Sequence, residues 1–154
     1  MKKVFQTIVD KGKGNCMQAA IASLLEKSMN EVPDFNHLSL EANKEGKGGY
    51  WFLFDYMESL GYEYDIHLNP DYHANKNLSG LVHDNIFKAL KNNNEFSVFF
   101  YARIESKTFP DTGHAVIVDR NLKVVHDPNP NGLSLESNPC EIDFILEFQK
   151  TTNA

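Results

Sequence analysis

Apolar residues in the first half of the chain recur at helical spacing. Residues 15–26 begin with Asn15, which can cap a helix, and continue with small and apolar side chains at intervals of three and four. Residues 50–60 carry large apolar side chains at every third position, and Gly61 follows as a stop signal. The pattern therefore predicts helices at 15–26 and 50–60, and a third helix at 81–91.

The second half of the chain shows the pattern of β-strands, with runs of Val, Ile, Phe and Tyr between turn residues. The predicted strands are 3–9, 62–68, 96–104, 114–118, 122–126 and 142–148. Residues 30–33 predict a short helical turn with Pro33 early in it, and the polar, glycine-containing residues 36–49 predict a loop. N-terminal helices packed on a C-terminal antiparallel sheet make an α+β fold, and the length suits one domain, 1–154.

Composition and charge narrow the expected partners and compartment. The net charge of −6 disfavours affinity for nucleic acid or for anionic membranes. No apolar stretch approaches the ~18 residues of a membrane span, and the N-terminus shows no secretory signal. Two cysteines, Cys16 and Cys140, are too few for a disulfide framework. We therefore expect a cytoplasmic protein with free thiols, and neither nucleic acid nor a membrane among its partners.

Cys16 stands in the first turn of the helix predicted at 15–26, and the glycine-containing residues 12–14 directly precede that helix. A cysteine is nucleophilic as its thiolate, and a helix N-terminus favours that anion through its dipole and its unpaired backbone N–H groups. A cysteine beside Ala and Leu is by itself more often a small core residue. Cys140, next to Pro139, has no comparable setting and is expected to be structural.

His114 begins a predicted strand immediately after Gly113, where the strand can fix its backbone while the ring points into a cleft. Asp127 ends the returning strand of the same hairpin, so the two residues are predicted neighbours. A base and the carboxylate that orients it require this arrangement. Alone, His114 would be a turn histidine and Asp127 a turn former before proline; together they favour a catalytic pair.

The order of these motifs resembles papain-like cysteine peptidases and is most similar to the small bacterial C39-like group, which has the fold of bacteriocin-leader peptidases. The motifs are an upstream Gln, Gly-Asn-Cys at a helix start, Gly-His-Ala-Val at a strand start and His-Asp-Pro after a hairpin. The resemblance implies a papain-like fold with Cys16 as nucleophile and His114 as general base. It further implies that Asp127 orients the histidine and that Gln6 helps to bind the oxyanion.

The oxyanion assignment departs from the family in its spacing. Gln6 lies ten residues before Cys16, further than is usual in such peptidases, and residues 10–14 can absorb the extra length. Gln18 is a rival, although its place on the helix directs it elsewhere. The backbone N–H of Cys16 can serve as the other donor in either case.

The resemblance implies acyl transfer through a thioester, by a cysteine-dependent peptidase or isopeptidase that acts on a protein or peptide without a cofactor. Two other functions stay open: a non-proteolytic thiol acyl enzyme, such as a deamidase, amidase or acyltransferase, and a partner-binding module that retains the fold. A complete Cys, His and Asp set disfavours the pure binder. The short chain leaves room for a partner protein that completes the cleft.

His126 precedes Asp127 and is expected on the opposite side of its strand. A zinc site made of Cys16, His114 and His126 would use ligand types that zinc accepts. The chain lacks the close paired spacing that is typical of zinc sites, so we expect no metal.

Overall fold

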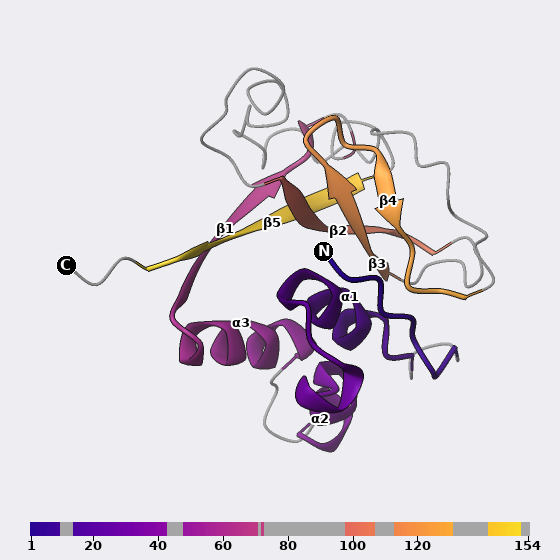
Figure 1. The fold of residues 1–154 in the computed structure, drawn as a ribbon, viewed down its shortest axis with the longest axis vertical. Helices are drawn as coiled ribbons and strands as arrows, with labels where there is room; N and C mark the ends of the chain where they lie inside the picture. The colour runs from indigo at the N-terminus through magenta and orange to yellow at the C-terminus, as the bar shows by residue number, and fades with distance from the viewer. Residues whose placement is uncertain are drawn as a thin grey trace.

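The computed structural model describes residues 1–9, 14–42, 48–70, 72, 98–106, 113–130 and 142–151. A layer of helices covers one face of an antiparallel β-sheet, and the N-terminal segment runs alongside the first helix (Figure 1). The fold is therefore α+β, as predicted. The expected helix at 81–91 and Cys140 lie outside the described residues.

The helical layer is built from three α-helices and one short 3₁₀ turn within the described residues. These elements are α1 (Cys16–Leu25), the 3₁₀ turn η1 (Met29–Glu31), α2 (Phe35–Glu41) and α3 (Gly49–Ser59). The middle of α1 is made of small side chains that are fully buried, so this helix can approach the sheet closely. It ends where Glu26 adopts a left-handed conformation with φ 57°, and Gly61 ends the α3 region with φ 85°. The predicted helices at 15–26 and 50–60 are thus confirmed.

The sheet has five strands within the described residues, in the order β1-β5-β2-β3-β4 with antiparallel neighbours. The strands are β1 (Tyr62–Leu68), β2 (Phe99–Glu105), β3 (Gly113–Asp119), β4 (Val124–His126) and β5 (Ile142–Lys150). The last strand of the chain, β5, lies between β1 and β2, so it joins an edge strand to the C-terminal hairpins (Figure 1). The strands predicted at 62–68, 114–118 and 142–148 are confirmed, and those at 96–104 and 122–126 are confirmed with shorter described extents.

Both faces of the central strands are buried, which explains why these strands are almost continuously apolar. On the helix side, Ile21 of α1 and Leu53 of α3 pack with Tyr101, Ile117 and Leu146 of the sheet. A second cluster of buried side chains occupies the opposite face. It contains Phe100, Ala102, Ile104, Val116, Val118, Leu122, Val124, Ile142 and Ile145.

The predicted strand at 3–9 is wrong: this segment pairs with no strand within the described residues. Its backbone N–H groups are taken by other partners instead. Val4 N donates to the Ser23 hydroxyl at 2.9 Å, and Gln6 N donates to the Pro128 carbonyl at 2.9 Å. The segment thereby bridges α1 and the end of β4 rather than extending the sheet.

The predicted loop at 36–49 is also wrong in its first part, which forms α2. Asp34 caps this helix by accepting a hydrogen bond from His37 N at 3.1 Å, and Phe35 is fully buried. Pro33 lies between η1 and α2, so the short turn forms at 29–31 and Pro33 is not part of it. Across the parts of the chain that the structure describes, no helix has the length and apolar character needed to cross a bilayer.

Candidate active site

Cys16 is the first residue of α1, and its thiol is free and partly buried. The first-turn N–H groups of a helix have no partner inside the helix, and its dipole is positive at this end. Cys16 also packs against the core between the helices and the sheet. The helix start that was predicted at Cys16 is therefore present, and the cysteine lies on the side of α1 that packs on the sheet.

His114 and Asp127 meet across the β3–β4 hairpin, as their spacing predicts. His114 is the second residue of β3, Asp127 directly follows β4, and His114 Nε2 donates to Asp127 Oδ1 at 2.6 Å. The two side chains are 10% and 1% exposed. Asp127 Oδ1 also accepts from Asn129 N at 2.9 Å, which fixes the carboxylate in place.

The His114 ring forms its second hydrogen bond with the side chain of Cys16. Nε2 is the ring nitrogen that meets Asp127. Burial acts to lower the pKa of His114, but the hydrogen bonds to Asp127 and Cys16 and the negative charge of both groups raise it to about 9. The ring is therefore held as an imidazolium at neutral pH, between a carboxylate and a thiol.

Gln6 is a buried residue whose backbone is tied to the segment after Asp127, through its bond to the Pro128 carbonyl. Its Nε2 donates to the Ile8 carbonyl at 2.9 Å. An amide nitrogen carries two hydrogens, so one remains for another acceptor. Among the described residues no hydrogen bond joins Gln6 to Cys16, and the oxyanion role of Gln6 stays a prediction.

Gln18, the rival for that role, is directed elsewhere. Its Nε2 donates to the Met29 carbonyl at 2.9 Å and to the Val32 carbonyl at 2.8 Å, so both amide hydrogens are occupied. Its function in the fold is to hold the turn after α1 against the helix.

Asn15 has a role that its sequence position did not reveal. It occupies the N-cap position of α1, but its side chain makes no cap hydrogen bond, so the predicted cap is wrong. Its Oδ1 instead accepts from the backbone N–H groups of Thr7 and Ile8, each at 3.0 Å, and its Nδ2 donates to Thr7 Oγ1 at 2.9 Å. The residue before Cys16 is thus bonded to the residue after Gln6, which brings the two sequence motifs together despite their long spacing.

His126 directly precedes Asp127, the partner of His114. Its side chain points away from His114, as expected because neighbouring residues on a strand face opposite sides. Its Nε2 donates to the Val4 carbonyl at 2.7 Å, and its ring meets the Phe5 ring edge to face at 5.0 Å. Burial lowers the pKa of His126. The zinc set of Cys16, His114 and His126 does not form among the described residues, where no cluster of three ligand groups includes any of them.

A pair of tyrosines lies within electrostatic reach of Cys16, and the sequence pattern did not predict that the two are in contact. The hydroxyl groups of Tyr50, in the first turn of α3, and Tyr101, on β2, are 2.9 Å apart. Burial raises the pKa of both, and both lie within electrostatic reach of Cys16. A polar aromatic residue in the middle of an apolar strand run was the available signal for Tyr101.

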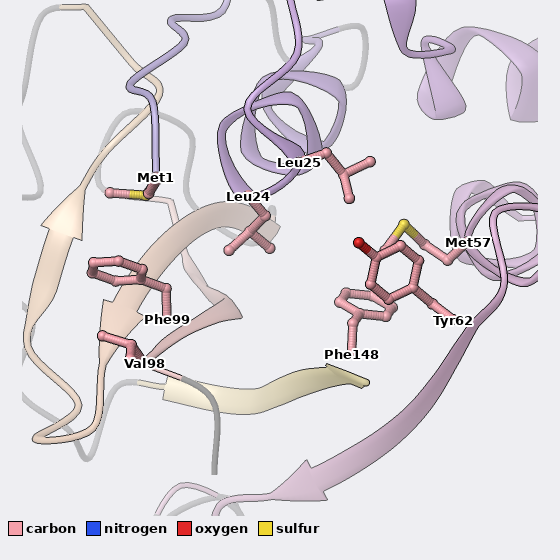
Figure 2. A pocket seen from close by; sticks show the side chains of 8 residues that line it. All are labelled: Met1, Leu24, Leu25, Met57, Tyr62, Val98, Phe99 and Phe148. Carbon is pink, nitrogen blue, oxygen red and sulfur yellow. The ribbon is translucent and has the colours of Figure 1, made fainter. Parts of the chain in front are cut away.

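An apolar hollow of about 230 Å³ lies elsewhere, beside the C-terminal end of α1 (Figure 2). Its lining comes from both termini and both layers: Met1, Leu24, Leu25, Met57, Tyr62, Val98, Phe99 and Phe148. Apart from the Tyr62 hydroxyl, these side chains are apolar (Figure 2). Because Cys16 begins α1 and Leu25 ends it, the hollow is separated from the thiol by the length of the helix.

Comparisons with protein-family models, with curated proteins and with solved structures find no match to this chain.

Proposed function

We propose that this protein is a cysteine-dependent hydrolase with a papain-like fold, similar to the small C39-like peptidases, which cleaves a peptide or isopeptide bond. The observation that carries the proposal is the contact of His114 with both Asp127 and Cys16. A histidine that joins a buried carboxylate to a helix-terminal thiol has the connectivity of a nucleophile, its base and the group that orients the base.

The first half of the reaction is attack by the Cys16 thiolate on the carbonyl carbon of the substrate. The carbonyl π bond breaks, and its electrons move onto the oxygen. The backbone N–H of Cys16 and the remaining Nε2 hydrogen of Gln6 are the proposed donors to this oxyanion. Asp127 keeps the His114 ring oriented through its bond with Nε2.

The second half releases both parts of the substrate. The protonated His114 gives its proton to the leaving amine as the C–N bond breaks, which leaves an acyl group on Cys16 as a thioester. His114, now neutral, takes a proton from water as the water attacks the thioester. The C–S bond then breaks, the acid product departs, and the Cys16 thiolate is left beside protonated His114, with no cofactor taking part.

Alkylation of intact protein tests the proposed thiolate–imidazolium pair without knowledge of the substrate. Protein is treated briefly with iodoacetamide at pH 5 to 9, and mass spectrometry with peptide mapping separates Cys16 from Cys140. We expect Cys16 to react at pH 5–6 about tenfold faster or more than in His114→Gln, because the imidazolium favours the reactive thiolate. Cys140 serves as the internal comparison.

The matched control is His37→Ala, which removes an exposed histidine on α2 and is expected to leave the Cys16 rate unchanged. Circular dichroism of each variant checks that the fold persists. Equal low-pH rates in the parent and in folded His114→Gln would remove the basis of the hydrolase proposal. A binding module that retains the fold would then be the better interpretation.

A further inference from the structure

Three side chains with metal-binding atoms converge on the outer strands of the sheet, away from Cys16. Asp65 and His67 are two residues apart on β1, so they share a face of that strand. The β1–β5 register places Asp65 opposite Glu147 and His67 opposite Ile145. The three side chains therefore meet on one face of the sheet, although they come from strands that are widely separated in the sequence.

That face is the one opposite the helices. On β5, the alternate residues Phe144, Leu146 and Phe148 belong to the core on the helix side. Ile145 belongs to the buried cluster on the other face, and alternation directs Glu147 to that face as well. Cys16 packs with the core on the helix side, so the cluster lies on the other face of the sheet from the thiol.

The distances within the cluster suit coordination of one ion. One ligand atom from each of Asp65, His67 and Glu147 lies within 4.8 Å of the other two, and His67 Nε2 is 3.7 Å from Glu147 Oε1. This separation is longer than a hydrogen bond. It is near the ~3.3 Å between neighbouring ligands around an ion with metal–ligand bonds of about 2.0–2.1 Å, and Asp65 has to approach the other two ligands from within 4.8 Å.

The charges of the cluster also favour a cation. Asp65 and Glu147 are directly opposite each other on neighbouring strands, where like charges repel. The Glu147 side chain is 2% exposed and that of His67 is 13% exposed, so solvent screens this end of the cluster poorly. Asp65 is exposed, which leaves one side of the cluster open to water.

We propose that Asp65, His67 and Glu147 form a binding site for a divalent transition-metal ion, with Zn²⁺ as the first candidate. One imidazole nitrogen and two carboxylate oxygens match the ligands of zinc, whereas Mg²⁺ and Ca²⁺ prefer oxygen alone. Three protein ligands leave a fourth position for water. The ion links the edge strand β1 to β5 and so fastens the edge of the sheet. Sequence analysis expects no metal, because the chain lacks the close paired spacing typical of zinc sites, and Glu147 is distant in the chain from Asp65 and His67.

Zinc binding to the full-length, tag-free chain tests the site. Both cysteines are first replaced, in Cys16→Ser/Cys140→Ser, so that no thiol competes for the ion. Equilibrium dialysis against Zn²⁺ followed by metal analysis is expected to show one bound ion per chain. His67→Ala and Asp65→Asn in this background should each weaken binding by about tenfold or more, since even residues that only support ligands contribute that much. Bound zinc should also raise the thermal unfolding temperature of the parent.

The matched control is His37→Ala, because His37 and Glu41 form an exposed histidine–carboxylate pair at 3.0 Å on α2. It should bind zinc as the thiol-free parent does. Asp65 is exposed, so Asp65→Asn keeps the test valid if removal of a buried partner unfolds the chain. The proposal is overturned if the parent binds no stoichiometric zinc, or if Asp65→Asn and His67→Ala bind it as tightly as the parent.

Discussion

At the scale of single residues, the decisive feature is that the His114 ring meets two partners, Asp127 and Cys16. Nε2 donates to a carboxylate that is itself held by a backbone N–H group, and the ring also bonds to the Cys16 thiol. Each neighbour stabilises the positive ring, so together they overcome the effect of burial. The proton that the proposed mechanism delivers to the leaving group is therefore already in place at neutral pH.

The titration of His114 can be followed directly by NMR with ¹³C-labelled histidine. We expect the His114 ring to titrate with a midpoint near pH 9 in the parent. In Asp127→Asn the midpoint should move to lower pH, because the charge and the strong hydrogen bond that favour the imidazolium are lost. Cys16→Ser should also lower it, since the ring's hydrogen bond with the thiol and the influence of its charge are both removed.

Assignment of the His114 signal follows from its absence in His114→Gln. A His114 midpoint that does not move in Asp127→Asn would contradict the role given to the carboxylate.

At the scale of elements, sequence periodicity was sufficient for α1, α3 and the strands, because each has a regular apolar face or run. It failed for α2, whose seven residues are shorter than the window of about 11–18 residues in which helical periodicity can be recognised. This helix depends on a cap from Asp34 and on burial of Phe35, neither of which creates a periodic pattern. It also failed for residues 3–9, where a run containing Val, Phe and Ile resembles a strand but its hydrogen-bond partners are side chains and a carbonyl from other elements.

The attachment of that N-terminal segment to α1 yields a prediction about Asn15. Asn15→Ala removes two bonds to backbone N–H groups and one to a hydroxyl, and should lower the free energy of unfolding by about 1–3 kcal/mol. Thr7→Val removes only the hydroxyl partner and should cost about 1 kcal/mol or less. Urea denaturation followed by circular dichroism measures both values.

The order of these two effects is the critical comparison. If Asn15→Ala costs no more than Thr7→Val, the bonds to the backbone of residues 7 and 8 do not hold the segment. If Asn15→Ala is folded, its Cys16 alkylation rate also shows whether the segment carrying Gln6 affects the thiol.

At the scale of the whole molecule, the candidate site exists only where the two layers meet. Cys16 comes from the helical layer, His114 and Asp127 from the sheet, and Gln6 from the segment that bridges them. The contact of His114 with Asp127 was predictable because a short hairpin fixes it locally. The meeting of His67 with Glu147 was not, because it depends on the register of β1 with a strand at the other end of the chain.

Two largely buried histidines, His114 and His126, should give the stability of the molecule a maximum near neutral pH. The pKa of His114 is raised to about 9, so its favourable contribution is complete below the ordinary histidine value of about 6.5 and is lost as the pH rises towards 9. The pKa of His126 is lowered by burial, so stability falls as the pH drops below about 6.5 and the unfolded chain binds the extra proton. The free energy of unfolding therefore decreases towards high pH because of His114 and towards low pH because of His126.

Urea denaturation of the parent at pH 5.5, 6.5 and 9.5 should therefore give the highest free energy of unfolding at pH 6.5. The loss between pH 6.5 and 9.5 is on the order of 3 kcal/mol if the full shift of His114 is expressed. His114→Gln should flatten the alkaline side alone, and His126→Gln should flatten the acidic side alone, because each variant removes one titrating group. If both variants kept the pH profile of the parent, groups other than these histidines would control the stability, and the buried pair of His114 with Asp127 would not be the charged contact on which the proposed chemistry depends.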